Sequence, residues 1–312
     1  MIRNGGKYIV YICTVLFLFC AFALTSCQRE AELSVNPILY KVSDDNSSVY
    51  VLGSIHLGRM NIYPLPPEIM AIYENCETVM FEVDFNTMQE QNDDLTREET
   101  EALVGAETVE RAVAVIKEAY PDMARRAQKI YPSVNMKNIN QVGYHTLQGL
   151  LSLAASTKSQ LIDECGIDQV FVSYALKDRK NIIGAECWKE QYDLTYNLPP
   201  EAYKAILNEY IDVEEMAKKL NDEFDIWCKG DAAALEQTEV SPLRRANENS
   251  WQRVQYDNFL IRNKHMADKV IQQLEKDETT FALLGVAHIV GEEGVIRLLQ
   301  ETGYAVDLVS ID

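Results

Sequence analysis

Four short apolar runs in this chain each end in a histidine or a carboxylate, and this pattern constrains the fold more than any other feature. "SVYVLGSIH" ends at His56 and "TTFALLGVAH" ends at His288, and both place a glycine three residues before the histidine. "TVMFEVDF" carries Glu82 near its end, and "NIIGAE" stops at Glu186. Runs of this length and composition predict β-strands with polar side chains at their carboxyl ends.

The segments between these runs predict the rest of the architecture. From Thr87 to Arg179, apolar residues recur at helical spacing without a further strand signal. Residues 199–236 and 249–276 also predict long helices, and the chain closes with a helix stopped by Gly303 and a last strand, "YAVDLVS". Strands that flank a helical middle predict an α/β fold, with a mixed, mostly parallel central sheet, flanking helices and a large helical insertion.

The N-terminus predicts export. A basic start precedes about 17 apolar residues, and "LTSC" then ends at Cys27. This order is typical of a secretory signal, and "LTSC" resembles the lipobox of bacterial lipoproteins, in which the cysteine is lipidated. An uncleaved membrane anchor is the alternative. We therefore expect a signal peptide over residues 1–26, a tether over 27–37 and one domain over 38–312.

The charge of the chain limits its partners. Residues 1–26 hold two positive charges, Arg3 and Lys7, and no negative one, so removing them moves the formal charge from −19 to −21. A strongly acidic surface repels phosphate backbones and anionic headgroups, so we expect no nucleic-acid partner. Membrane contact should come from the lipid on Cys27, whose several acyl chains give stable anchoring. We expect the domain in the bacterial cell envelope, at the outer membrane, facing the periplasm or the cell surface.

Four cysteines remain beyond Cys27: Cys76, Cys165, Cys187 and Cys228. In an oxidising compartment they could form up to two disulfides, whose pairing the spacing does not assign, and buried free thiols are the alternative. No CxxC or CxxxxC pair occurs, which disfavours a thiolate zinc site.

The strand-end residues predict a mixed imidazole and carboxylate site. Ligands bind beyond the carboxyl ends of parallel strands, so His56, Glu82, Glu186 and His288 could converge there. Such a set suits Mn, Fe, Co or Zn better than Mg or Ca, and an ion of this kind activates water for hydrolysis, with one carboxylate as general base. The alternatives are hydrogen-bonded structural histidines and a serine nucleophile at Ser54.

The glycines of the two GxxH motifs predict that another element packs closely against each strand. With the period of two of a strand, Gly53 and His56 point to opposite faces, as do Gly285 and His288. We therefore expect each glycine to admit a helix or neighbouring strand on the face opposite the histidine.

Together these motifs resemble the TraB/GumN family, which includes the Tiki proteins. The resemblance rests on "GSIH" and "GVAH", on "FEVD", on "GID", on "GAE" with "EQ" after it, on "RN", and on the tail "GVAHIVGEEGVIRLLQETGYAV". It covers residues 38–310 and implies a fold related to erythromycin esterase and to a haem-binding lipoprotein. The Tiki members resemble metal-dependent proteases that use Mn or Co, so the resemblance favours these ions, with Zn or Fe as alternatives.

The resemblance also implies roles for individual residues. His56 and His288 match the metal-binding histidines, and Glu82 and Glu186 match acidic positions, one a ligand and the other a ligand or the base. Five further residues are expected to orient substrate or support the site: Asp84, Asp168, Gln191, Arg262 and Asn263. The expected function is a lipid-anchored hydrolase that acts on a peptide or protein substrate through metal-activated water. A non-catalytic peptide- or haem-binding lipoprotein of the same fold is the alternative.

Overall fold

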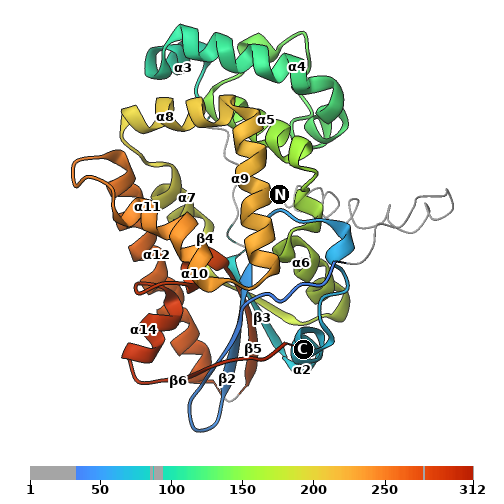
Figure 1. Cartoon of the computed structure of the whole chain (residues 1–312), viewed down its shortest axis with the longest axis vertical. Helices are drawn as coiled ribbons and strands as arrows, with labels where there is room; N and C mark the ends of the chain where they lie inside the picture. The colour runs from blue at the N-terminus through green and yellow to red at the C-terminus, as the bar shows by residue number, and fades with distance from the viewer. Residues whose placement is uncertain (1–32, 85–86, 88–93, 277, 312) are drawn as a thin grey trace, which may run out of the picture.

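The computed structural model describes residues 33–84, 87, 94–276 and 278–311, and within them the chain forms one six-stranded sheet (Figure 1). The strands are β1 (Leu39–Ser43), β2 (Ser48–Ser54), β3 (Thr78–Asp84), β4 (Asn181–Cys187), β5 (Thr279–Gly285) and β6 (Ala305–Leu308). Their order is β4-β3-β5-β2-β1-β6. The first four run parallel, whereas β1 and β6 pair antiparallel. The predicted mixed, mostly parallel α/β fold is confirmed.

Helices cover both faces of this sheet. The elements around it are η2 (Met60–Ile62), α2 (Pro67–Asn75), η5 (Asp163–Cys165), α6 (Ile167–Asp178), α7 (Trp188–Tyr196), α10 (Ala232–Leu235), the π-helix η6 (Glu236–Val240), α11 (Ser241–Arg244), α12 (Trp251–Leu274), α13 (Val286–Ile289) and α14 (Val295–Glu301). In Figure 1, α12 and α14 lie on one side of the sheet, and α2 and α6 lie on the other. Because both faces are covered, β3 is buried from Thr78 to Glu82 and does not alternate between buried and exposed residues.

Aromatic packing fixes α2 and α6 against the centre of the sheet. The ring of Tyr73 on α2 lies 5.2 Å from that of Phe171 on α6 and 5.8 Å from that of Phe281 on β5, both in edge-to-face geometry. Phe171 stacks on Phe281 at 5.3 Å. All three side chains are fully buried, and aromatic pairs of this kind add about 0.5–1.5 kcal/mol each beyond the area they bury.

The helical insertion forms a cap with an apolar core of its own. Its elements are α3 (Arg97–Val104), α4 (Ala106–Ile130), η4 (Ile139–Gln141), α5 (Tyr144–Ser159), α8 (Pro200–Ile211) and the start of α9 (Val213–Cys228). In α4 the buried residues recur every three or four positions, as in Val109, Val113 and Ile116, and they face α5 and α8. This cap lies above the carboxyl ends of the parallel strands, with the β1–β2 turn at the far end of the sheet (Figure 1).

Helix α9 joins the cap to the sheet. It packs on α5 at one end, and near its other end the buried Trp227 indole donates to the Gly53 carbonyl of β2 at 2.9 Å. The helix therefore holds the cap over the edge where β2 ends.

The chain is attached to the domain from Leu33 onward. The Leu33 amide donates to the Asn61 carbonyl at 2.9 Å, the Asn36 amide donates to the Cys228 carbonyl at 2.8 Å, and Val35 is buried. The predicted signal peptide and lipidation site at Cys27 lie outside the described residues. Of the helices that the structure describes, none is long and apolar enough to cross a membrane.

Candidate functional site

The four strand-end residues lie along one edge of the sheet. Glu82 faces His288 and shares Arg262 with Glu186, whereas His56 pairs with Asp168. Because β4, β3, β5 and β2 are parallel neighbours, Glu186, Glu82, His288 and His56 follow one another along this edge in that order. The edge faces the helical cap (Figure 1). Residues more than 200 positions apart in the chain are thus brought together by parallel pairing.

His288 is held with one ring nitrogen facing Glu82. Its Nδ1 lies 2.6 Å from Oδ1 of Asn263, and the Asn263 side-chain N–H donates to the Glu293 carbonyl at 2.8 Å, which fixes the amide orientation. An amide oxygen can only accept, so Nδ1 carries the proton and Nε2 has a free lone pair. The ring is buried and stacks on Phe259 at 4.5 Å. Burial lowers the pKa of His288 to about 3, so the imidazole is neutral.

Glu82 is the most heavily contacted carboxylate of the site. Its Oε1 pairs with Arg262, accepts from the Gln191 amide at 3.1 Å and lies 3.8 Å from Nε2 of His288. Its Oε2 accepts from the Gly285 backbone N–H at 3.1 Å. Burial by itself raises the pKa of Glu82, but the positive charges of His288, which is protonated at the low pH where Glu82 titrates, and of Arg262 outweigh burial and lower the pKa to about 2. The residue is therefore an ionised acceptor.

Glu186 is in a different electrostatic state. Its side chain has 0% exposure, its Oε2 accepts from Nε of Arg262 at 2.9 Å, and its Oε1 is buried without a hydrogen-bond partner. Burial raises the pKa of Glu186 to about 7, although Arg262 acts in the opposite direction. Two neighbouring carboxylates whose pKa values are pushed apart can divide acid and base roles.

His56 lies two residues beyond β2, and its side chain is 73% exposed. Its Nδ1 pairs with Oδ2 of Asp168 at 2.9 Å, and this hydrogen bond raises the pKa of His56 above its ordinary value. Asp168 reaches it because the start of α6 packs against the backbone after β2. The Ile167 amide donates to the Ile55 carbonyl at 2.9 Å, and a Cβ on Gly166 would lie 2.1 Å from the His56 carbonyl oxygen.

The expectation about the GxxH glycines was right for one motif and wrong for the other. At Gly53, a Cβ would lie 2.8 Å from atoms of both Val286 and Ile289, so the glycine admits helix α13. At Gly285, the space is instead taken by Oε2 of Glu82, 3.1 Å away. Gly285 and His288 do not alternate as strand residues do, because β5 ends at Gly285 and His288 lies in the one-turn helix α13.

Four of the five supporting residues predicted from the sequence contact a strand-end residue. Arg262, Asn263, Gln191 and Asp168 contact a strand-end residue, as described above. Asp84 ends β3, and its backbone carbonyl accepts from the Thr87 hydroxyl at 2.7 Å.

Three further residues near the edge bear on the alternatives. The Ser54 hydroxyl is buried on β2 without a partner, so the structure does not present it as a nucleophile. Phe259 was not predicted from the sequence, although it precedes Asn263 by four positions and so shares its helix face. Glu223 on α9 was not predicted either, and its carboxylate acts electrostatically on His56.

Imidazole nitrogens and carboxylate oxygens, the donor atoms at this edge, are of the kinds that bind transition-metal ions. The free Nε2 of His288 and Oε1 of Glu82 are spaced like two ligands of one ion, and each histidine has its Nδ1 held by an acceptor, as metal-binding histidines do. Within the described residues, no group of three or more His, Cys, Asp or Glu is arranged to hold a metal ion. The four cysteines Cys76, Cys165, Cys187 and Cys228 are unpaired, and all but Cys187 are buried.

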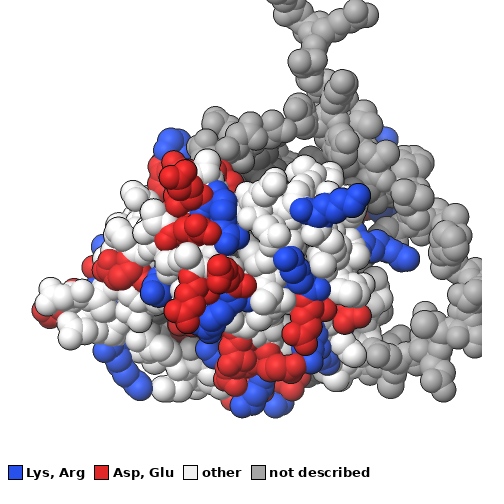
Figure 2. Space-filling model, turned by 90° about the horizontal axis from the view of Figure 1, so that it is seen from above, with Lys and Arg blue, Asp and Glu red and all other residues white. Residues whose placement is uncertain are grey.

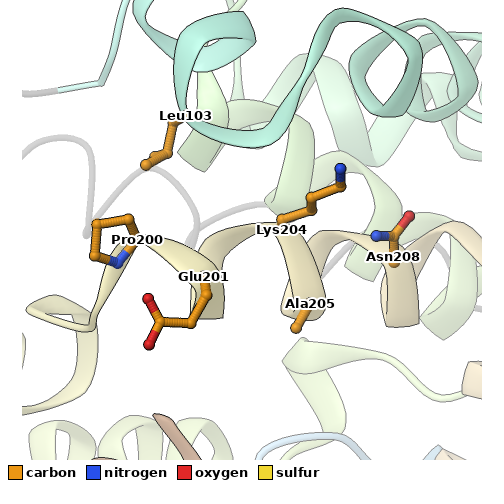
Figure 3. Close-up of a pocket in the computed structure, with 6 residues that line it drawn as sticks. All are labelled: Leu103, Pro200, Glu201, Lys204, Ala205 and Asn208. Atoms are coloured by element: carbon orange, nitrogen blue, oxygen red, sulfur yellow. The ribbon is translucent and has the colours of Figure 1, made fainter. Parts of the chain in front are cut away.

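Two pockets in the described residues lie on the cap and not at this edge. One, of about 570 Å³, opens between α3 and α8 (Figure 3) and is lined by Leu103, Pro200, Glu201, Lys204, Ala205 and Asn208. The other, of about 560 Å³, lies among α4, α5 and the α8–α9 junction. Viewed from above in Figure 2, acidic side chains gather in clusters with lysines and arginines between them.

Comparison with known proteins agrees with the motifs. A search of curated proteins and a search of solved structures each found no match. The model of the TraB/PrgY/gumN family matches residues 38–308, which include all six strands and every strand-end residue discussed here. The chain therefore belongs to the TraB/PrgY/gumN family.

Proposed function

We propose that this protein is a metal-dependent hydrolase of peptide or protein substrates. The observation that carries the proposal is the pairing of His288 with Glu82 at the carboxyl edge of the sheet. Asn263 fixes the imidazole so that its free Nε2 faces Oε1 of Glu82 at 3.8 Å, and that carboxylate is ionised. Both groups are in the protonation states that metal ligands need.

Each strand-end residue has a part in this proposal. His288 and Glu82, whose facing atoms lie 3.8 Å apart, would hold the ion, which supplies a water of lowered pKa and polarises a carbonyl. His56 would have to turn toward them and lose its proton to add a third ligand, because the described residues hold no preformed group of three or more His, Cys, Asp or Glu. The unpartnered Oε1 of Glu186 would accept a proton as general base, and its pKa of about 7 suits that role near neutral pH. Arg262 keeps both carboxylates in place.

The proposed ion and location come from the sequence. Imidazole and carboxylate donors suit Mn, Co, Zn or Fe, and the family resemblance favours Mn or Co. We propose that the domain is held at the bacterial outer membrane by a lipid on Cys27, with the membrane as a partner only through that lipid.

Metal content and cleavage measured together test this function. Purified full chain in detergent should bind one ion and cleave a mixed peptide library, and His288→Ala should lose both. His265→Ala is the matched control, because His265 is an exposed histidine on the same helix, α12, as Asn263. Equal metal content in the two variants would refute the proposal. Stoichiometric capture of peptide or haem without turnover would instead identify a binding protein.

A further inference from the structure

Helix α7 presents a line of aromatic rings beside the strand-end carboxylates. Trp188, Tyr192 and Tyr196 are spaced four residues apart and so share one helix face. Their ring centroids are 6.0 and 4.9 Å apart, and His145 on α5 continues the line 5.7 Å beyond Tyr196. The rings therefore extend from the end of β4 to the cap.

This helix is exposed to an unusual degree for its position. None of its nine residues is buried, and Tyr196 keeps 38% of its surface exposed. The indole N–H of Trp188 is enclosed and has no acceptor in the described structure. Tryptophan and tyrosine pair an apolar body with a polar tip, so rings left accessible in this way are typical of a binding surface.

The same helix also contacts the reacting groups of the proposed site. Gln191 lies within the ring-bearing stretch and donates to Oε1 of Glu82 at 3.1 Å, and Trp188 follows Glu186 by two positions. A molecule that lies along the rings would therefore have one end at the carboxylates.

The tilt of the rings indicates which kind of molecule fits. Successive planes meet at 43° and 40°, and His145 stands at 87° to Tyr196, so the rings leave wedges between them and form no flat platform. Side chains fill wedges of this kind, whereas a sugar chain stacks on flat ring faces. Alternate side chains of an extended peptide lie about 6.6–6.8 Å apart, which is near the 6.0 Å between the Trp188 and Tyr192 rings and wider than the 4.9 Å between the Tyr192 and Tyr196 rings.

Charge restricts the choice further. Two carboxylates, Glu82 and Glu186, share Arg262 at one end of the line and so keep an excess of negative charge when both are ionised. The exposed Glu190 on the same helix adds to it. An acidic side chain bound here would meet like charges, which costs binding free energy and disfavours anionic ligands.

We propose that Trp188, Tyr192 and Tyr196 form the substrate-binding wall for an extended peptide with apolar side chains, and that this wall selects against acidic ones. This inference rests on the proposed hydrolase function, but peptide binding can be measured without turnover. The wall would hold the peptide while the strand-end groups act on the bond next to it.

Calorimetric titration of the full chain in detergent tests the wall. The probes are an acetylated hexapeptide amide with Phe at alternate positions and Gly between them, the same peptide with Asp in place of Phe, and cellohexaose. We expect the Phe peptide to bind at least 10-fold more tightly than the Asp peptide. Tyr192→Ala should weaken Phe-peptide binding at least 5-fold while metal content stays the same, and Tyr192→Phe should restore it. Tyr304→Ala, at a half-buried tyrosine next to the edge strand β6, is the control.

The outcomes separate this inference from the hydrolase proposal. Phe-peptide binding that depends on Tyr192, without any cleavage, would support the substrate-binding wall and contradict the hydrolase proposal. Three results would overturn the substrate-binding wall even if cleavage occurs. They are equal Phe-peptide affinity in wild type and Tyr192→Ala, equal affinity of wild type for the Phe and Asp peptides, and cellohexaose binding that depends on Tyr192.

Discussion

Oδ1 of Asn263 lies 2.6 Å from Nδ1 of His288 and sets the direction of the imidazole. Asn263 is fully buried in the middle of α12, and its own N–H donates to the Glu293 carbonyl. The amide therefore has a single usable orientation, and it leaves Nε2 of His288 as the atom that faces Glu82. This contact links the long helix α12 to the strand end on which the proposed chemistry depends.

Removing this acceptor should weaken metal binding without removing a ligand. We expect Asn263→Ala to lower the affinity for Mn²⁺ about 10- to 100-fold, as with other residues that orient metal-binding histidines. Asn263→Asp keeps an acceptor oxygen at the same place and should retain most of the affinity. Calorimetric titration with Mn²⁺ measures both, and Lys264→Ala on the exposed side of α12 is the control. Equal affinities for Asn263→Ala and Lys264→Ala would contradict the orienting role.

Arg262 should be essential for stability because it pairs two carboxylates in a buried place. The exposed fractions of the Arg262, Glu82 and Glu186 side chains are 13%, 10% and 0%. Arg262→Met removes the cation that pairs with both acids and the hydrogen bond to Glu186, and we expect it to lower the free energy of unfolding by about 3–5 kcal/mol. Urea unfolding measures this loss, and adding Glu186→Gln to Arg262→Met should recover part of it.

The control for this prediction lies on the same helix. Arg253 pairs with Asp257 across one turn near the surface, and Arg253→Met should cost about 0.5 kcal/mol or less. Similar losses for Arg262→Met and Arg253→Met would show that the buried pairs contribute no more than a surface pair.

Glu223 should make the stability depend on pH. Burial, and then the neighbouring Glu239, raise the pKa of Glu223 from 4.5 to about 7, although His56 acts against the rise. A carboxyl whose folded pKa is raised favours folding less and less as the pH rises from about 4.5 through about 7, because the unfolded state ionises more easily. We therefore expect Glu223→Gln to be more stable than wild type at pH 8 and to show little difference at pH 4.5. A constant difference across this range in urea unfolding would contradict the shifted pKa.

Gly53→Ala should separate helix α13 from β2. The added methyl group would lie 2.8 Å from Val286 and Ile289, so the helix that carries His288 must shift. Overpacking of this kind costs about 1–3 kcal/mol, and the shift should also lower Mn²⁺ affinity. Thermal unfolding and Mn²⁺ titration measure the two effects, with Ser48→Ala at the start of the same strand as control. Unchanged stability and affinity would show that α13 does not depend on the glycine.

The sequence predicts the strand ends well because local pattern determines them. Apolar runs bounded by turn residues locate β2, β3, β4 and β5, and the helical middle between β3 and β4 predicts parallel pairing. The pattern fails at the end of β5, where the expected strand ran to His288 but the structure begins a helix after Gly285. Apolar residues after a strand fit either state, and the helix that forms here packs Val286 and Ile289 against Gly53, a contact that the local pattern does not contain.

The roles of the supporting residues depend on contacts that no local pattern contains. By spacing alone, Arg262 and Asn263 belong to an ordinary exposed helix face. They turn toward the site because α12 packs on β4 and β2, which are far from it in the chain. Only the family resemblance marks this pair before the fold is known, and it does not say that Arg262 bridges both glutamates.

Equilibrium dialysis of the purified full chain against Mn²⁺ measures whether His56 and His288 bind the ion. We predict one ion per chain in wild type and in the His145→Ala/His265→Ala control, and none in the His56→Ala/His288→Ala variant. If the His56→Ala/His288→Ala variant still binds one ion with wild-type affinity, the proposal that these two histidines bind the metal is wrong.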